Sequence, residues 1–205
     1  MTIGRILGAS ALVFFFVASM AAAQQSPTVR IRGQIEAVDG SMLTIKARDG
    51  NTMNVKLADS PRIVAMVKIS VADIKQGEFI GVTAMPQPDG SLKAIGLNIF
   101  MDSQRGVVPA KFFPWDREPG STMTNADVES TVAGVDGQVI MVKYPDGEKK
   151  VVVPPGTPVV SYLAGNMSDI KPGAQMIIMA AQKSPDGSLT APAINVGRDG
   201  AVPPM

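Results

Sequence analysis

The residues best suited to recognising another molecule lie in the middle of the chain. Residues 101–127 hold three of the seven aromatic side chains found beyond the first 25 residues, between prolines that interrupt regular structure. Disordered segments rarely concentrate aromatic residues in this way. The candidate surface for a partner or ligand consists of Lys111, Phe112, Phe113, Trp115, Asp116 and Arg117. The alternative interpretation is a clasp, in which these aromatic rings are buried against the neighbouring domains.

The chain contains few of the residue types that enzymes use for catalysis. The sequence contains neither histidine nor cysteine, which excludes Ser-His-Asp and Cys-His arrangements and histidine-based zinc sites. Asp116 and Glu118 are close enough for paired-carboxylate chemistry, but neighbouring surface carboxylates are usually only solvated. Ser70 and Lys68 could form a nucleophile and base, yet Ser70 is better explained as a helix cap. We therefore expect no enzyme, no catalytic residues and no cofactor.

Metal binding is an alternative function that the composition leaves open. Eleven methionines lie beyond the first 25 residues, and thioethers are soft ligands suited to Cu(I). Met176 and Met179 are close in sequence, but they lie in an apolar strand where core packing explains them better. The seven Asp-Gly pairs lack the spacing of a calcium loop and are typical of turns. We expect no metal site, and keep a periplasmic metal-handling protein with carboxylate and methionine ligands as the alternative.

The N-terminus has the layout of a secretory signal peptide, which predicts a periplasmic or secreted protein. Arg5 precedes an apolar run, Ile6–Ala18, and small residues before Gln24 offer a cleavage site after Ala23. The run is short for a bilayer span, which favours cleavage over the alternative of an uncleaved membrane anchor. No later segment is apolar and long enough to span, so the mature chain should not be membrane-spanning. Without Arg5 it has 18 basic and 18 acidic residues, which argues against nucleic-acid binding. The partner is expected to be a protein or an envelope component.

Self-alignment predicts a tandem duplication. At an offset of 97 residues, 35–40 (IEAVDG) aligns with 132–137 (VAGVDG), and Pro-Asp-Gly-Ser-Leu occurs at both 88–92 and 185–189. Apolar residues alternate with polar ones in 28–38, the pattern of a half-buried strand. Asp39-Gly40 then predicts a type I′ hairpin turn.

Each unit contains one element that is not a strand. Ser70 and Asp73, and likewise Asn166 and Asp169, have the spacing of a capping box, which predicts a short helical turn. Three meandering strands, this turn and a closing hairpin fit a small closed barrel of the OB type. The alternative is an open sandwich.

The predicted fold class is all-β, with two tandem small OB-like β-barrels, each containing one short helical turn, after a cleaved signal peptide. The predicted segments are a signal peptide (1–23), a first barrel unit (28–100), a Pro/aromatic connector (101–127), a second barrel unit (128–198) and a tail (199–205).

The units resemble a family of small bacterial exported β-barrel domains of uncharacterised function, often found in tandem. The resemblance is carried by residues 33–45 (GQIEAVDGSMLTI), 73–77 and 89–94, although the second unit has Ser130 where the first has Gly33. The segment from Pro114 to Asn125 is similar to a connector in two-unit proteobacterial relatives. These motifs are turn and core residues, so they imply a fold but no catalytic residues. We expect an exported soluble binding or structural module of unknown ligand, without catalysis.

Overall fold

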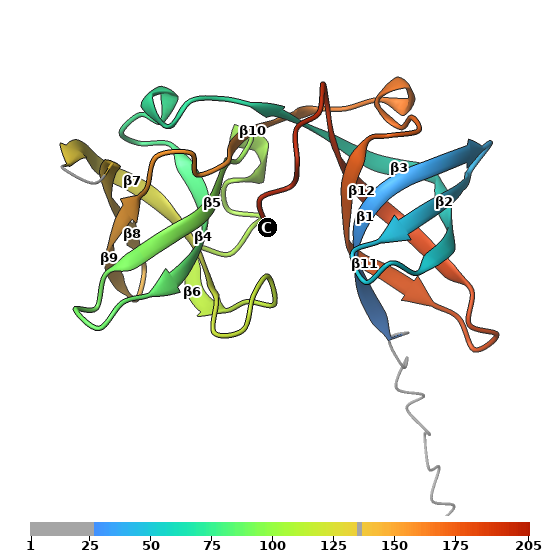
Figure 1. The fold of residues 1–205 in the computed structure, drawn as a ribbon, viewed down its shortest axis with the longest axis horizontal. Coiled ribbons are helices and arrows are strands. Elements are labelled where there is room, and N and C mark those ends of the chain that lie inside the picture. Colours follow the sequence, from blue (N-terminus) through green and yellow to red (C-terminus); the bar gives the residue numbers. More distant parts are fainter. Residues whose placement is uncertain (1–26, 135–136) are drawn as a thin grey trace, which may run out of the picture.

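The computed structural model describes residues 27–134 and 137–205, and this part of the chain is all-β, as the sequence predicts (Figure 1). The predicted signal peptide lies outside the described residues. Helical structure within the described ranges is confined to three 3₁₀ turns: η1 (Val71–Asp73), η2 (Asp102–Gln104) and η3 (Met167–Asp169). None of the helices described could cross a membrane.

The strands close into two five-stranded barrels that lie side by side (Figure 1). A closed barrel, rather than an open sandwich, is therefore confirmed. Barrel one contains β1 (Thr28–Asp39), β2 (Met42–Ala47), β3 (Thr52–Lys68), β11 (Gln175–Lys183) and β12 (Leu189–Gly197), and it closes through the parallel pair β3–β12. Barrel two contains β4 (Phe79–Pro86), β5 (Leu92–Ile99), β7 (Thr122–Gly134), β8 (Gly137–Tyr144) and β9 (Gly147–Val153), and it closes through the parallel pair β5–β9.

Each barrel takes strands from both sequence units, which differs from the expectation that each unit closes on its own hairpin. The hairpin β4–β5 belongs to the first unit but completes barrel two, and β11–β12 belongs to the second unit but completes barrel one. The physical reason lies in β3, a 17-residue strand that has an irregularity at residues 58–61 beside β12 and continues beyond Pro61. It leaves barrel one and carries the chain across to the other barrel.

The two crossing segments meet between the barrels. The second half of β3 pairs antiparallel with β10 (Val159–Ala164), from Val64↔Ala164 to Lys68↔Val160. β10 also pairs in parallel with β5, while β3 pairs in parallel with β12. The exchange is therefore reciprocal, with the β3–β10 pair at its centre.

Backbone hydrogen bonds identify equivalent positions in the two barrels. Ile35 donates to Ala174 O (3.0 Å) and accepts from Gly173 N (2.8 Å). Val128 makes the same pair of bonds, to Glu78 O (2.9 Å) and from Gly77 N (2.8 Å). Ile35 thus corresponds to Val128 rather than to Val132, so the alignment at an offset of 97 is wrong for the first strand of each unit.

Local turn chemistry explains the doubled Pro-Asp-Gly-Ser-Leu sequence. Asp89 Oδ1 accepts hydrogen bonds from the backbone and hydroxyl of Ser91 (3.0 and 2.6 Å), and Asp186 does the same for Ser188 (2.9 and 2.7 Å). The glycine in each turn has a positive φ, 83° at Gly90. These bonds hold both carboxylates in the charged form, which lowers their pKa. The sequence motif is a hairpin turn.

Two local predictions can be checked directly. The capping boxes are confirmed, because Ser70 and Asn166 accept from the backbone of η1 and η3 while Asp73 and Asp169 bond back. The prediction of a type I′ turn with Asp39-Gly40 at its centre is wrong. Asp39 pairs with Met42, so the loop is Gly40-Ser41, and Gly40 alone supplies the positive φ (56°).

Three groups of buried apolar residues make up the core. One fills barrel one and one fills barrel two, and each combines side chains from both sequence units. The third lies between the barrels and consists of Val64, Met66, Met123, Val160, Tyr162, Ile177, Ala201 and Met205. Apolar burial stabilises by roughly 25 cal/mol per Å². This third group therefore stabilises the contact between the barrels and forms the floor of the site described next.

Candidate binding cavity between the barrels

The connector adds a strand to barrel two and presents its aromatic residues on alternate sides. β6 (Lys111–Pro114) pairs antiparallel with β7, with Phe113 opposite Met123. Because side chains alternate along a strand, Phe113 faces the space between the barrels whereas Phe112 faces outward. The ammonium group of Lys149 lies 5.1 Å from the Phe112 ring, which is 36% exposed.

Trp115 links the connector to barrel one. Its ring meets Phe113 edge-on at 5.6 Å between centroids, and the Arg30 guanidinium lies 4.0 Å from its centroid. The connector loop is fixed by Trp115 N donating to Ser121 O (2.8 Å) and by Ser121 Oγ donating to Trp115 O (3.1 Å). A cation over a tryptophan face contributes about 0.5–2 kcal/mol. These contacts fix the connector against barrel one, as in the clasp interpretation, and Trp115 also lines a cavity.

Asp116 completes the link between the connector and barrel one. Its Oδ1 lies 2.7 Å from both Arg30 and Arg32, two residues apart on β1. The hydrogen bond from Arg32 lowers the pKa of Asp116 to about 2, more than burial raises it. Burial also lowers the pKa of the neighbouring Arg117; the charge of Glu118 opposes this effect, and the charge of Arg32 adds to it.

Asp116 should make stability fall at low pH. Its folded-state pKa is depressed below the usual value of 3.8, so its contribution is complete above about pH 4 and is lost as pH falls through 2. The side chain is 53% exposed, which reduces the expected contribution to about 1 kcal/mol. Asp116→Asn should lose about that amount at pH 7, measured by urea unfolding. The difference from the unsubstituted protein should disappear at pH 2, and a difference independent of pH would contradict this assignment.

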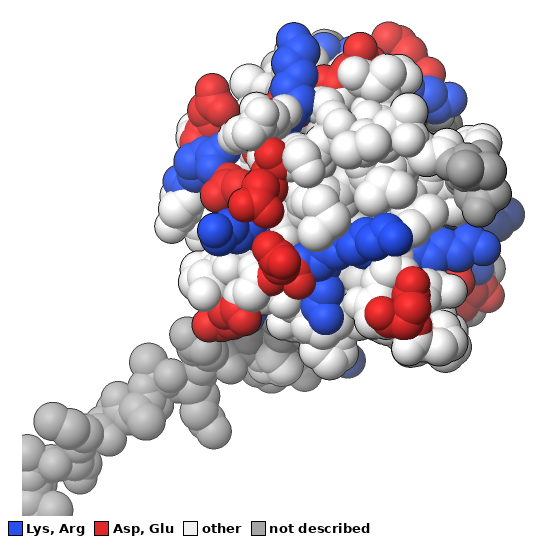
Figure 2. All heavy atoms as spheres, turned by 90° about the vertical axis from the view of Figure 1, so that its left-hand side faces the viewer, with Lys and Arg blue, Asp and Glu red and all other residues white. Residues whose placement is uncertain are grey.

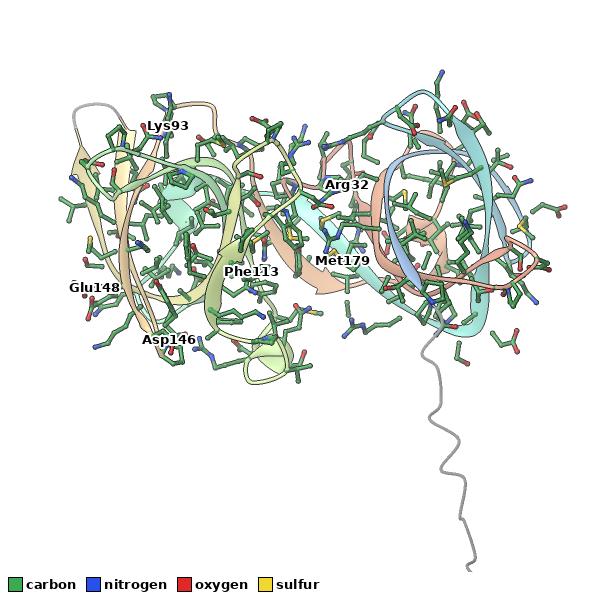
Figure 3. The ribbon with its side chains drawn as sticks, turned by 90° about the horizontal axis from the view of Figure 1, so that it is seen from below. Arg32, Lys93, Phe113, Asp146, Glu148 and Met179 are labelled. Carbon is green, nitrogen blue, oxygen red and sulfur yellow. The ribbon has the colours of Figure 1, made fainter. Side chains whose placement is uncertain are left out.

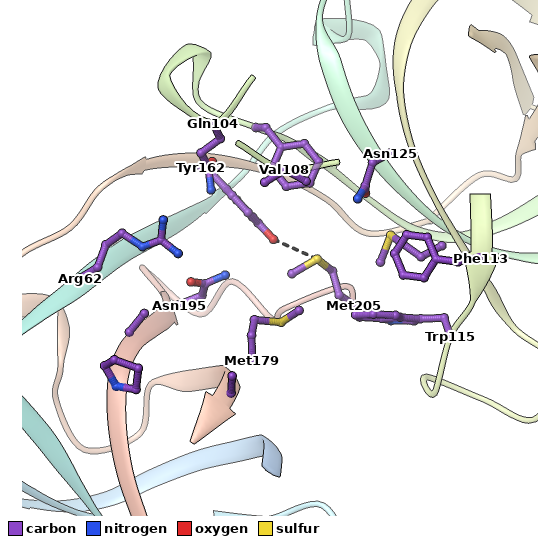
Figure 4. A pocket seen from close by; sticks show the side chains of 15 residues that line it. Arg62, Gln104, Val108, Phe113, Trp115, Asn125, Tyr162, Met179, Asn195 and Met205 are labelled. Atoms are coloured by element: carbon purple, nitrogen blue, oxygen red, sulfur yellow. Dashed lines mark hydrogen bonds between the residues drawn. The ribbon is translucent and has the colours of Figure 1, made fainter. Parts of the chain in front are cut away.

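A cavity of about 340 Å³ lies between the barrels (Figure 4). Its lining comes from both barrels, the connector and the chain end, and includes Arg62, Phe100, Gln104, Val108, Phe113, Trp115, Met123, Asn125, Tyr162, Met179, Ala180, Pro192, Ala193, Asn195 and Met205. Viewed from below, Arg32, Phe113 and Met179 lie between the barrels, whereas Lys93, Asp146 and Glu148 lie on barrel two away from this space (Figure 3). Aromatic rings and thioethers predominate, as in sites for apolar small molecules.

Polar atoms are few in this cavity, and two lack a partner among the described residues. Asn125 donates through Nδ2 to Pro109 O (3.2 Å), but its Oδ1 is buried without a hydrogen bond, as is Nε1 of Trp115. An unmet buried donor or acceptor costs about 1–3 kcal/mol. Both atoms belong to residues that line the cavity, although the atoms themselves are buried.

The chain end reaches into the same space. The Tyr162 hydroxyl donates to Met205 Sδ (3.0 Å), and burial raises the pKa of Tyr162. Arg32 Nε donates to Met205 O (2.8 Å), and Met205 is only 4% exposed. Figure 4 shows the Met205 side chain between those of Tyr162 and Trp115. The segment after β12 thus forms part of the cavity wall.

The six candidate residues of the connector do not form one surface. Phe113 and Trp115 line the cavity, while Asp116 and Arg117 line a separate cleft on barrel one. Phe112 faces away from the cavity, and Lys111 is exposed with its ammonium 5.0 Å from the Phe113 ring. The sequence offered no signal for Tyr162, Asn125 or Met205, because their convergence depends on the exchanged strands.

The other chemical candidates have structural explanations. Ser70 Oγ accepts from Ala72 N (3.2 Å), and this capping contact accounts for its position. Asp116 is bound to two arginines rather than paired with Glu118. Within residues 27–134 and 137–205, acidic side chains do not gather in groups of three that could hold a metal ion.

Comparisons with known proteins returned no match to a family model, a curated protein or a solved structure.

Proposed function

We propose that this protein is a binding module without catalytic activity, and that its ligand is a small, mostly apolar molecule bound between the barrels. The observation that carries the proposal is the cavity of about 340 Å³, lined by aromatic and thioether groups. Ligand cavities are typically 300–1,000 Å³ with a few placed polar groups. Trp115 and Asn125 are the proposed polar partners, because their Nε1 and Oδ1 have no hydrogen bond within the described residues; a small side-chain adjustment would present them to a ligand carrying a hydroxyl or an amide.

The proposal includes export and an origin by duplication. The N-terminal sequence supports a cleaved signal peptide and a periplasmic or secreted protein. The paired hairpin turns, paired capping boxes and matching bonds at Ile35 and Val128 support two OB-like units in tandem. The resemblance to exported bacterial β-barrel domains is consistent with both, and the partner is then an envelope component or protein.

Phe113→Ala should weaken binding of a neutral apolar probe, N-phenylnaphthylamine, by at least about tenfold, because it removes one wall of the cavity. The matched control is Phe112→Ala, a change of the same size on the next residue, whose ring faces away. It should change the affinity by less than about twofold. Fluorescence titration of the probe measures both. Absence of probe binding, or equal losses in the two variants, would refute the cavity as a ligand site.

A second candidate function is soft-metal handling, and one observation favours it. Met123, Met179 and Met205 come from three separate segments and line one cavity, although no two are close in sequence. Thioethers suit Cu(I). The probe titration separates the two candidates: displacement of the probe by Cu(I) under reducing conditions, and not by apolar alcohols, would replace the first function by the second.

A further inference from the structure

A second concave surface lies on barrel one, beside the cavity but distinct from it. This basic cleft has a volume of about 500 Å³ and is lined by Val29, Arg30, Ile31, Arg32, Ala47, Arg48, Asp49, Met53, Asp116, Arg117, Lys183, Gly187 and Leu189. The residues come from β1, the β2–β3 hairpin, the connector and the β11–β12 hairpin. Five basic side chains face two acidic ones, a net charge of +3 in a chain that is nearly neutral overall.

The two carboxylates leave most of this positive charge unmatched. Asp116 is shared between Arg30 and Arg32. Asp49 accepts from the backbone and side chain of Asn51 (3.0 and 2.9 Å), which lowers its pKa and keeps it ionised. In the described ranges neither carboxylate forms an ion pair with the remaining three cations of the cleft.

Two guanidinium donors of the cleft residues also lack hydrogen-bond partners within the described residues. Nε of Arg30 and Nε of Arg117 are buried, and neither has a hydrogen-bond partner in the part of the chain that the structure describes. Burial lowers the pKa of Arg117 although the charge of Glu118 opposes this effect, and the charge of Arg32 lowers the pKa further. Such a cluster is stabilised when an anion enters it.

Barrel two shows that the fold does not need these cations. Since Ile35 corresponds to Val128, Arg30 and Arg32 correspond to Met123 and Asn125. The pairs Lys183↔Leu189 and Pro86↔Leu92 place Pro86 where barrel one has Lys183.

Other parts of barrel two also lack the excess of positive charge found in the basic cleft. The β8–β9 turn holds Pro145 and Asp146 where the β2–β3 turn holds Arg48. On the face of barrel two shown in Figure 2, basic and acidic side chains are interspersed. The excess of positive charge is therefore a property of the cleft and not of the barrel architecture.

We infer that the basic cleft binds a multiply charged phosphate-type anion, either a free diphosphate or the phosphate headgroup of a lipid. Arginine is the side chain best matched to phosphate, because its planar donors bind two oxygens at once. Arg48, Arg117 and Lys183 line the cleft from three separate segments, while Arg30 and Arg32 lie against the Trp115 ring. This site goes beyond the proposed apolar ligand and stands on different residues.

Pyrophosphate titrated into the protein by calorimetry at low salt tests the inference. Binding is expected, and it should weaken as salt is raised because the attraction is screened. The double variant Arg48→Gln/Lys183→Gln should bind at least about tenfold more weakly. Both side chains are exposed, so the variant should fold normally. The control Lys75→Gln/Lys143→Gln makes the same change in net charge on barrel two and should bind within about twofold of the original.

Asp116→Asn provides a test in the opposite direction. It removes a negative charge from the cleft and releases two arginines, so pyrophosphate should bind more tightly. No binding of pyrophosphate, an equal loss in the control, or weaker binding by Asp116→Asn would each overturn the inference. None of these outcomes bears on the probe titration of the apolar cavity, so the two proposals can fail separately.

The source of the phosphate is distinguished by vesicles. Sedimentation with phosphatidylcholine vesicles containing phosphatidic acid, reversed by pyrophosphate and lost in Arg48→Gln/Lys183→Gln, assigns the site to a lipid headgroup. Pyrophosphate binding without vesicle binding assigns it to a free diphosphate. Both results support the phosphate chemistry of the cleft.

Discussion

A chain cut once in the connector should remain a single particle. A protease site placed at Gly106-Val107, where Val107 is 69% exposed, would divide the protein into one fragment carrying β1–β5 and another carrying β6–β12. We expect the two fragments to stay associated at nanomolar concentration and to separate only in denaturant. Two barrels that each closed on their own hairpin would instead drift apart on dilution.

The reason is that the strand pairings crossing between the fragments are those that close the barrels. They are β1–β11, β3–β12, β3–β10, β4–β7, β5–β9 and β5–β10. Each fragment alone keeps a three-stranded meander and a hairpin whose apolar faces are uncovered. Interfaces that resemble a divided core are the most stable between chains.

Size-exclusion chromatography with light scattering, before and after cleavage, measures the association. The uncut protein is the size control, and cut protein unfolded in denaturant shows that cleavage is complete. Elution of two separate folded fragments at nanomolar concentration would contradict the exchanged arrangement. Co-elution with an unchanged mass would support it.

Local features of this fold could be read from the sequence because their causes are local. Alternation in 28–38 predicted β1, and the spacing of Ser70 and Asp73 predicted the turn η1. The Pro-Asp-Gly-Ser turns form through contacts within five residues of the chain. All of these depend on near neighbours, which the order of residues specifies directly.

The exchange of hairpins could not be predicted in this way. The turns at 88–92 and 185–189 are identical, and both hairpins present similar apolar faces, so either could complete either barrel. The choice is made by β3, which continues as a strand beyond the irregularity at residues 58–61. The first-strand alignment failed for a related reason: β1–β2 pairing ends at Asp39↔Met42 but β7–β8 pairing ends at Gly134↔Gly137, which shifts equivalent positions by four residues.

The candidate site was predictable only in part. Phe113 and Trp115 stood out because aromatic residues are scarce and prolines surround them. Tyr162 and Met205 meet across 43 positions, and Arg32 reaches Met205 across 173, so no local pattern indicates them. Sites built where separate domains meet depend on tertiary contacts of this kind.

Gly197→Ala should release the chain end from the cavity. An added Cβ would lie 1.7 Å from Ala201 O and 2.7 Å from Ala201 C, and these backbone atoms cannot rotate away. The turn that places them, closed by Ala201 N donating to Arg198 O (3.0 Å), must therefore open. Ala201 and Met205 would lose their burial, and core losses of this kind cost about 2–5 kcal/mol.

Gly200→Ala is the matched control, because it lies in the same turn and an added Cβ there meets nothing within 4 Å. Its cost should be limited to about 1–2 kcal/mol for a non-glycine residue at a φ of 75°. Thermal unfolding should place Gly197→Ala well below Gly200→Ala, and trypsin should cleave after Arg198 rapidly only in Gly197→Ala. Equal stabilities, or protection of Arg198 in both variants, would mean that the chain end does not depend on this close approach. Release of Met205 should also remove one wall of the cavity and weaken probe binding, so the packing of the tail and the proposed function can be tested in the same variant.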